Sequence, residues 1–180
     1  MKIFRLLSVL LDYPSDEFLA SLRESAGKSS FAFVESLDEA DAFSAVELQT
    51  IASFVTTLLD ADPMALQGAY VQNFDLTAEH SLHLTHHIFG EEKSRGPALI
   101  DLGEFYRSYG LKADEKELPD YLPVILEFVS TLWLDEARVF LADVAKVLKM
   151  LADNLEKSDS MYAPLIRIIE KQGSLARLAA

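Results

Sequence analysis

The sequence contains no cysteine among its 180 residues. The chain therefore has no disulfide, no thiolate metal ligand and no cysteine nucleophile. The absence of disulfides fits a reducing compartment such as the cytoplasm. Long apolar runs are also missing, and no stretch reaches the length of a membrane span, so we expect no direct membrane insertion. The first residues, MKIFRLLSVLLDYP, have an apolar run interrupted by Arg5 and ended by Asp12, which predicts a core helix and not a signal peptide.

Glycine is scarce, with seven residues in the chain, and no Asn-Gly or Asp-Gly pair marks a β-hairpin. Half of the residues are apolar, and they recur at helical spacing. The spacing predicts helices over residues 43–59, 97–109, 123–133 and 161–171, and a longer helix that begins after a cap at Asp135. We expect an all-α fold, in which residues 1–180 form a single-domain helical bundle of roughly seven to nine helices.

Three local signals predict where helices begin and end. Asp62 followed by Pro63 predicts a helix start, because the aspartate can cap free amides and the proline needs no amide partner. Gly110 predicts the end of the helix over residues 97–109. The segment from Gly27 to Ser30 is expected to form a short loop.

Basic residues are missing from the 64 positions between Lys28 and Lys93, and the net charge of the whole chain is −13. Such a surface repels nucleic acid, which excludes a nucleic-acid partner. It attracts a basic peptide, although an acidic face that only aids solubility remains an alternative. The stretch carries eleven acids: Glu35, Asp38, Glu39, Asp41, Glu47, Asp60, Asp62, Asp75, Glu79, Glu91 and Glu92.

Three histidines, His80, His83 and His87, follow one another at i, i+3 and i+7. On a helix this spacing would align them on one face, where they could bind zinc with Glu91 as an added oxygen ligand. The alternative is two surface histidines and one structural histidine. No glycine-rich phosphate loop and no Gly-x-Ser-x-Gly motif is present. We therefore expect a binding protein with no cofactor and no catalytic residue. The alternative is a small metal-dependent enzyme that uses the cluster of His80, His83 and His87.

The segment GEEKSRG, residues 90–96, predicts a loop between two helices. Gly90 and Gly96 would let the backbone turn tightly, and Pro97 favours the start of the next helix. Glu91 and Arg95 would pair with each other or reach a bound peptide, unless they merely order the loop.

A second segment, ELPDYLP, places two prolines on either side of Asp120. The prolines would hold this stretch in place, so that it presents the carboxylate of Asp120 beside an exposed Tyr121. Tyr70 and Phe74 lie four residues apart, and aromatic residues at this spacing are more often core than a ligand site.

The run YVQNFDLTAEHSLHLTHHIFGEEKSRGPALIDLGEFYRSYGL, followed by ELPDYLPVILEFV, resembles the nitrate reductase assembly chaperones of the NarJ type, also called the delta subunit. The opening LLSVLLDYP resembles their N-terminal helix. The shared order is a tyrosine and a phenylalanine four apart, Ser-Leu, His-x-x-Gly-Glu, Arg-Gly, Asp-Leu and Glu-Leu-Pro-Asp-x-Leu-Pro.

The resemblance implies a cytoplasmic, non-catalytic protein that binds the apo catalytic subunit of a molybdenum reductase through its basic, leader-like N-terminal segment. It would keep that subunit competent for insertion of the molybdenum cofactor and an iron–sulfur cluster. We expect the segment to form an amphipathic helix in a helix-lined groove, with its Lys and Arg against Glu91 and Asp120. The implied client-binding residues are Tyr70, Phe74, His87, Gly90, Glu91, Arg95, Gly96, Asp120, Tyr121, Leu122 and Pro123.

Overall fold

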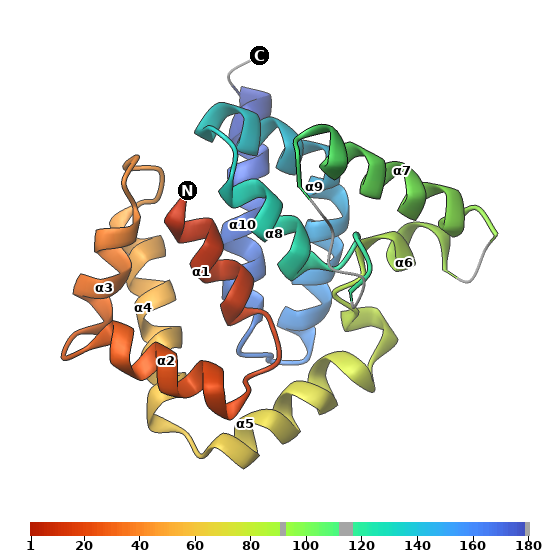
Figure 1. Cartoon of the computed structure of the whole chain (residues 1–180). Coiled ribbons are helices and arrows are strands. Elements are labelled where there is room, and N and C mark those ends of the chain that lie inside the picture. The colour runs from red at the N-terminus through yellow and green to blue at the C-terminus, as the bar shows by residue number, and fades with distance from the viewer. Residues whose placement is uncertain (91–92, 112–116, 179–180) are drawn as a thin grey trace.

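A computed structural model describes residues 1–90, 93–111 and 117–178, and the chain within these ranges is helical (Figure 1). The expected all-α fold is confirmed. The described residues form ten α-helices, of which nine have seven or more residues, against the expected seven to nine. They are α1 (Lys2–Leu10), α2 (Asp16–Ala26), α3 (Ser30–Leu37), α4 (Ala45–Asp60), α5 (Pro63–Tyr70), α6 (Leu84–Phe89), α7 (Arg95–Ser108), α8 (Leu122–Ser130), α9 (Leu134–Lys157) and α10 (Ala163–Leu178). A π-helical turn, η1 (Val71–Asp75), and a 3₁₀ turn, η2 (Ala78–His80), connect α5 to α6.

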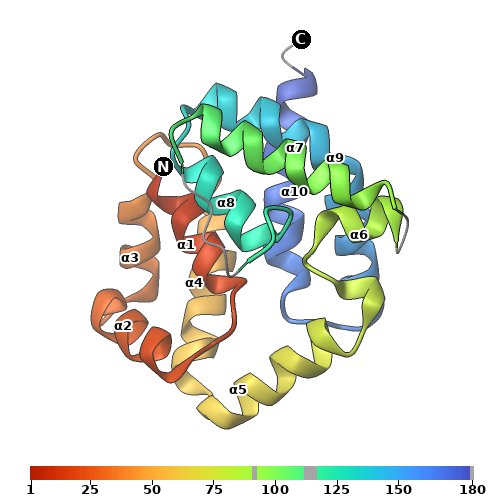
Figure 2. The same ribbon diagram turned by 45° about the vertical axis from the view of Figure 1, so that its right-hand side comes forward.

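One hydrophobic core takes side chains from all ten helices. The predicted N-terminal core helix is confirmed, because Ile3, Phe4 and Leu7 of α1 are fully buried. Helix α1 packs against α8 in the middle of the molecule, between α2–α4 on one side and α6, α7, α9 and α10 on the other (Figures 1 and 2). No helix in the described ranges is both long and apolar enough to cross a membrane.

Helices α9 and α10 run antiparallel in close contact. Gly173 of α10 makes this approach possible, since a Cβ atom there would lie 2.5 Å from the carbonyl oxygen of Leu141. A backbone oxygen cannot move aside as a flexible side chain can, so the crossing point requires glycine.

The predicted helix starts are partly correct. Asp62 caps α5, where its side chain accepts from the backbone N–H of Ala65 at 3.0 Å, and Pro63 opens the helix. Gly110, with φ +79°, follows the end of α7 as expected. The cap at Asp135 is wrong, because α9 begins at Leu134 and Trp133 holds the N-cap position, two residues before Asp135. There the backbone N–H of Trp133 donates to the Glu136 carboxylate at 3.3 Å.

Candidate functional site

The ELPDYLP segment is joined to the chain just before α6 by an antiparallel bridge between Tyr121 and His83. The backbone N–H of Leu84 donates to the carbonyl of Asp120 at 3.0 Å, and the N–H of Leu122 donates to the carbonyl of Leu82 at 2.9 Å. We call this bridge the clasp. It fixes the chain just before α6 against the chain just before α8.

Asp120 lies beneath the clasp and is completely buried, so the prediction that it presents its carboxylate to a partner is wrong. Its Oδ2 accepts from the backbone N–H of Thr85 at 3.1 Å and also from the Thr85 hydroxyl. Its Oδ1 lies 3.2 Å from Nδ1 of His83. Asp120 is therefore a structural group that ties the start of α6 to the start of α8.

The charge of Asp120 is stabilised where it is buried. Burial acts to raise the pKa of its carboxyl group. The hydrogen bonds from His83 and Thr85 and the charge of Arg95 outweigh that effect, so the pKa lies below its usual range. We infer that Asp120 is ionised at neutral pH.

Arg95, at the start of α7, completes this buried group. Its Nε donates to the Thr85 hydroxyl oxygen at 3.0 Å, and its Nη2 lies 3.5 Å from Oδ2 of Asp120. Its guanidinium group faces Thr85 and Asp120, and the Arg95 side chain is only 22% exposed. The partner suggested for it from the sequence, Glu91, lies outside the described residues.

The two glycines of the segment 90–96 have different roles. Gly90 ends α6 with φ +55°, a backbone conformation that strongly favours glycine, so the predicted tight turn is confirmed there. Gly96 is the second residue of α7 and is not among the positive-φ glycines, so the prediction that it turns the backbone is wrong. Pro97 lies in the first turn of α7, where its missing amide has no helical partner to lose.

Three tyrosines meet beside the clasp. The hydroxyls of Tyr70 and Tyr121 lie 2.9 Å apart, and the Tyr121 hydroxyl donates to Oδ1 of Asp12 at 3.1 Å. The ring of Tyr13 packs edge-on against Tyr70 at 5.6 Å. Burial raises the pKa of Tyr121, and the nearby Tyr70 and Asp12 raise it further, so the hydroxyl stays protonated at neutral pH. Tyr121 is half-buried and not exposed as predicted.

Tyr70 and Phe74 are both buried and belong to an aromatic cluster with Tyr162. The rings of Tyr70 and Phe74 lie 4.9 Å apart, and Phe74 lies 4.7 Å from Tyr162. Phe74 belongs to η1, and π-helical turns often occur near functional sites. The alternative that these two residues are core is confirmed, and they support the clasp from below.

The histidines do not share a helix face, so that prediction is wrong. His80 ends η2 and donates from Nδ1 to the Asn73 carbonyl at 3.0 Å, and His87 of α6 donates from Nε2 to the Ser81 carbonyl at 2.7 Å. His83 is bound to Asp120 in the clasp. His80 is buried and the other two are partly buried, so none is a free surface histidine. Among the described residues no group of three or more His, Cys, Asp or Glu side chains is placed to hold a metal.

The remaining predicted site residues are also mainly structural. Leu122 is fully buried in the core, and the carbonyl of buried Pro123 accepts from the Ser8 hydroxyl at 2.7 Å. The hydroxyl of Tyr106 donates to the Pro119 carbonyl at 2.9 Å, which fixes the other end of the ELPDYLP segment to α7.

Asp12, Tyr13 and Thr85 were not predicted to belong to this site, and His83 was considered only as a metal ligand. Asp12 and Tyr13 are exposed, Tyr13 by 43%, and lie in the turn between α1 and α2, where Asp12 contacts Tyr121 and Tyr13 contacts Tyr70. The signal available in the sequence was the DYP run, which follows the first apolar segment and ends it with an acid and an aromatic residue.

The base-free stretch does not form one free acidic face. Asp38 is buried and accepts from the backbone N–H groups of Ala42 and Phe43, both at 3.0 Å. Buried Glu47 pairs at 2.9 Å with Lys171, which comes from outside the stretch. Asp62 caps a helix. Several of its acids therefore stabilise the fold and do not remain available to a basic partner.

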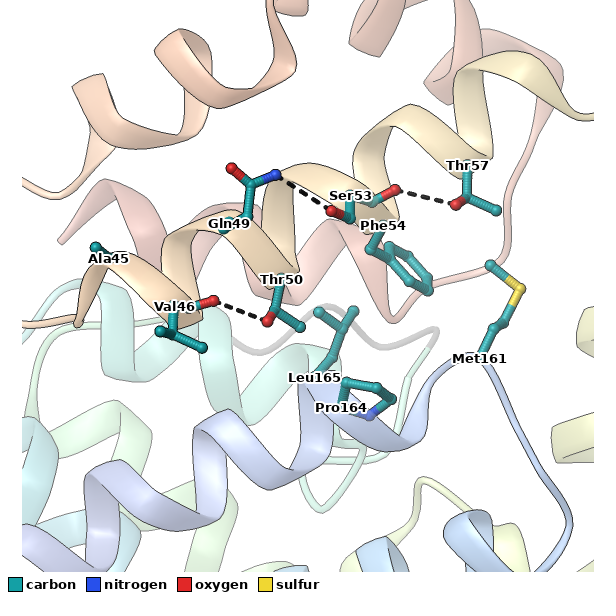
Figure 3. Close-up of a pocket in the computed structure, with 10 residues that line it drawn as sticks. All are labelled: Ala45, Val46, Gln49, Thr50, Ser53, Phe54, Thr57, Met161, Pro164 and Leu165. Carbon is teal, nitrogen blue, oxygen red and sulfur yellow. Dashed lines mark hydrogen bonds between the residues drawn. The ribbon is translucent and has the colours of Figure 1, made fainter.

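A cavity of about 540 Å³ lies between α4 and the start of α10 (Figure 3). Phe54 and Leu165 form its inner wall, and Val46 stands exposed at its edge. The hydroxyls of Thr50 and Thr57 donate to carbonyls of their own helix. The cavity is lined by Ala45, Val46, Gln49, Thr50, Ser53, Phe54, Thr57, Met161, Pro164 and Leu165, none of which is charged. It therefore has no group that would select a basic peptide.

The sequence profile of the nitrate reductase delta subunit family matches residues 35–167. The chain belongs to this family. The matched range contains both sides of the clasp, from Tyr70 to Pro123.

Individual members of the delta subunit family are similar over nearly the whole chain. The nitrate reductase molybdenum cofactor assembly chaperone NarJ of Escherichia coli K12 is 32% identical over 171 residues, which cover 95% of this chain and 69% of that protein. The probable chaperone NarJ of Bacillus subtilis 168 is 32% identical over 166 residues, or 92% and 85% of the two chains. The probable chaperone NarW of Escherichia coli K12 is 33% identical over 175 residues, or 97% and 69%.

Proposed function

We propose that this chain is a cytoplasmic, non-catalytic assembly chaperone for a molybdenum reductase of the nitrate reductase type. It binds the N-terminal segment of the apo catalytic subunit and keeps that subunit competent for cofactor insertion. The family membership and the names of three relatives at 32–33% identity support this function. The whole chain acts as one all-helical chaperone domain.

The surface beside the clasp supports binding of a basic peptide. It combines the exposed carboxylate of Asp12 with the rings of Tyr13 and Tyr121 and the partly exposed ring of His83. A Lys or Arg side chain can pair with the carboxylate and stack on a neighbouring ring. Asp12 therefore takes the role that the sequence predicted for Asp120, and this exposed acid beside two tyrosines is the observation on which the proposed peptide contact rests.

The buried residues of the motif position this surface. Asp120 holds His83 and Thr85, and Tyr70 contacts both the hydroxyl of Tyr121 and the carbonyl of Leu11, at 2.9 and 3.1 Å. Because Leu11 directly precedes Asp12, the network fixes the distance between the acid and the ring beside it. A surface fixed before binding loses less conformational entropy when the peptide docks.

We expect the bound segment to be an amphipathic helix whose apolar side chains contribute most of the affinity. Charged contacts at the edge of a binding surface act mainly on association rate and specificity. Raising the salt concentration should therefore weaken binding without abolishing it.

The assembly function can be tested in cells that express the catalytic subunit with and without this chain. We expect the subunit made without the chain to contain little molybdenum by mass spectrometry of the metal and to have little reductase activity. Re-expression of the wild-type chain should restore both. Equal molybdenum content and activity in the two preparations would overturn the proposed function.

A further inference from the structure

A second cleft, of about 350 Å³, lies between the end of α7 and the first half of α9. It is lined by Phe105, Tyr109, Leu132, Asp135, Glu136, Val139, Phe140 and Asp143. None of these residues belongs to the clasp or to the tyrosines beside it. The volume accommodates one or two large side chains of a partner.

The floor of this cleft is aromatic. Phe105 of α7 stacks on Phe140 of α9 with ring centroids 5.8 Å apart and an angle of 14° between the ring planes. Buried Phe128 supports both rings from below, at 5.6 Å from Phe105 and 5.1 Å from Phe140. Tyr109 packs against Phe105 at 5.2 Å and is 50% exposed. The rings are thus held rigidly while part of their surface stays open to solvent.

The rim of the cleft is acidic. Asp135, Val139 and Asp143 follow one another at intervals of four residues, which places them on one face of α9. Neither Asp135 nor Asp143 forms an ion pair within the described part of the chain, and none of the described residues that line the cleft is Lys or Arg. Arg138 faces elsewhere, donating to Gln172 and to the carbonyl of Ala42.

Apolar side chains continue the surface beyond the cleft. Val139 on the rim is 60% exposed, and Trp133, next to the lining residue Leu132, is 83% exposed. A large exposed aromatic residue beside an apolar cleft is typical of a protein-binding surface.

We propose that this cleft docks a basic amphipathic helix of a partner protein, at a site separate from the surface formed by Asp12 and Tyr121. The apolar face of that helix fills the space above Phe105 and Phe140. Its Lys and Arg side chains pair with Asp135 and Asp143, and they contact the open aromatic faces as cations. The two carboxylates select a basic partner, because they form ion pairs with Lys and Arg side chains and repel an acidic helix. This proposal stands whether or not the N-terminal segment of a reductase binds beside the clasp.

Trp133 provides a direct readout, because it is the single tryptophan of the chain and directly follows the lining residue Leu132. The probe is a synthetic helical peptide with leucines on one face and lysines on the other, and the control probe has glutamate in place of every lysine. We expect the lysine peptide to shift the Trp133 emission to shorter wavelength in a saturable manner and to protect it from acrylamide. The glutamate peptide should do neither.

Paired variants separate this site from general attraction to an acidic protein. Asp135→Asn with Asp143→Asn should raise the Kd of the lysine peptide by about five- to ten-fold, and Val139→Ser by about two- to five-fold. The matched variant Glu35→Gln with Asp60→Asn loses the same charge from exposed positions on α3 and α4, and its Kd should stay within about two-fold. Circular dichroism checks that each variant keeps its helical fold. The absence of a saturable Trp133 response, or an equal effect of the two double variants, would overturn the proposal.

Discussion

The Nδ1 atom of His83 lies 3.2 Å from Oδ1 of Asp120, and 36 residues separate the two in sequence, although the aspartate carboxylate is completely buried. Thr85 and Arg95 also contact the carboxylate of Asp120, through a hydrogen bond and an ion pair respectively. A buried carboxylate with several donors is costly to disrupt, because removing its charge leaves those donors without a matched partner. The motif that the sequence marks as a contact site is therefore first a structural element.

Asp120→Asn should lower the free energy of unfolding by about 2 to 4 kcal/mol, because the amide keeps the shape but cannot accept from all of its neighbours. Urea denaturation followed by circular dichroism measures the change. Asp101→Asn is a matched control on the exposed face of α7, and it should stay within about 0.5 kcal/mol of the wild type. A similar stability for both variants would show that the buried charge contributes little.

The stabilisation by Asp120 should disappear in acid. Its folded-state pKa is below the ordinary value of 3.8, so the folded protein gains stability from the ionised carboxylate above that pH and loses it as the pH falls through the lower, folded pKa. We expect the difference in unfolding free energy between wild type and Asp120→Asn to be constant near neutral pH and to shrink below about pH 4. Glu47 and Asp153 also have lowered pKa values, but they are present in both proteins and cancel in the difference. A difference that does not change down to the acid transition would contradict the assignment.

Two glycines in one segment should respond oppositely to alanine. Gly90→Ala should cost about 1 to 2 kcal/mol, because φ is +55° at that position. Gly96→Ala should be neutral or stabilising by up to about 0.5 kcal/mol, since the residue lies in the first turn of α7 with no heavy atom within 4 Å of an added Cβ. Thermal unfolding of the two variants side by side provides the comparison. Equal losses would mean that the segment needs flexibility at both ends.

His80→Ala should destabilise the chain by about 1 to 2 kcal/mol, because it removes a hydrogen bond to the Asn73 carbonyl from a buried position. Glu79→Ala changes the exposed neighbouring side chain and should have little effect. Both are measured by urea denaturation. If His80→Ala were as stable as its control, the hydrogen bond of His80 would contribute little to the fold.

Helices were predictable where a single segment contains its own signals. The cap at Asp62 and the glycine stop at Gly110 act on their immediate neighbours, and the structure confirms both. Asp135 looked equally suitable as a cap, but the side chain of Glu136 accepts from the backbone N–H of Trp133, so the cap lies two residues before Asp135. Short-range competition of this kind lies within the usual uncertainty of helix ends.

The site was harder to predict because its contacts join distant segments. Nothing in the sequence around Asp120 shows that Thr85 and Arg95 will enclose it, so a charged residue between two prolines was interpreted as exposed. The histidine spacing was interpreted as one helix, whereas a 3₁₀ turn and a bridge interrupt it. Asp12 and Tyr121 are more than a hundred residues apart in sequence, and only the fold brings them into contact.

Isothermal titration calorimetry of the chain with the N-terminal peptide of its catalytic subunit tests the central claim most directly. We predict saturable one-to-one binding to the wild type. In Asp12→Lys, whose fold is checked by circular dichroism, the affinity should fall by about ten-fold or more, because the new charge repels the peptide. Asp60→Lys, a charge reversal at the end of α4, should stay within about two-fold of the wild type. Absence of binding to the wild type would contradict the proposed recognition, and equal affinity in both variants would place the peptide away from Asp12.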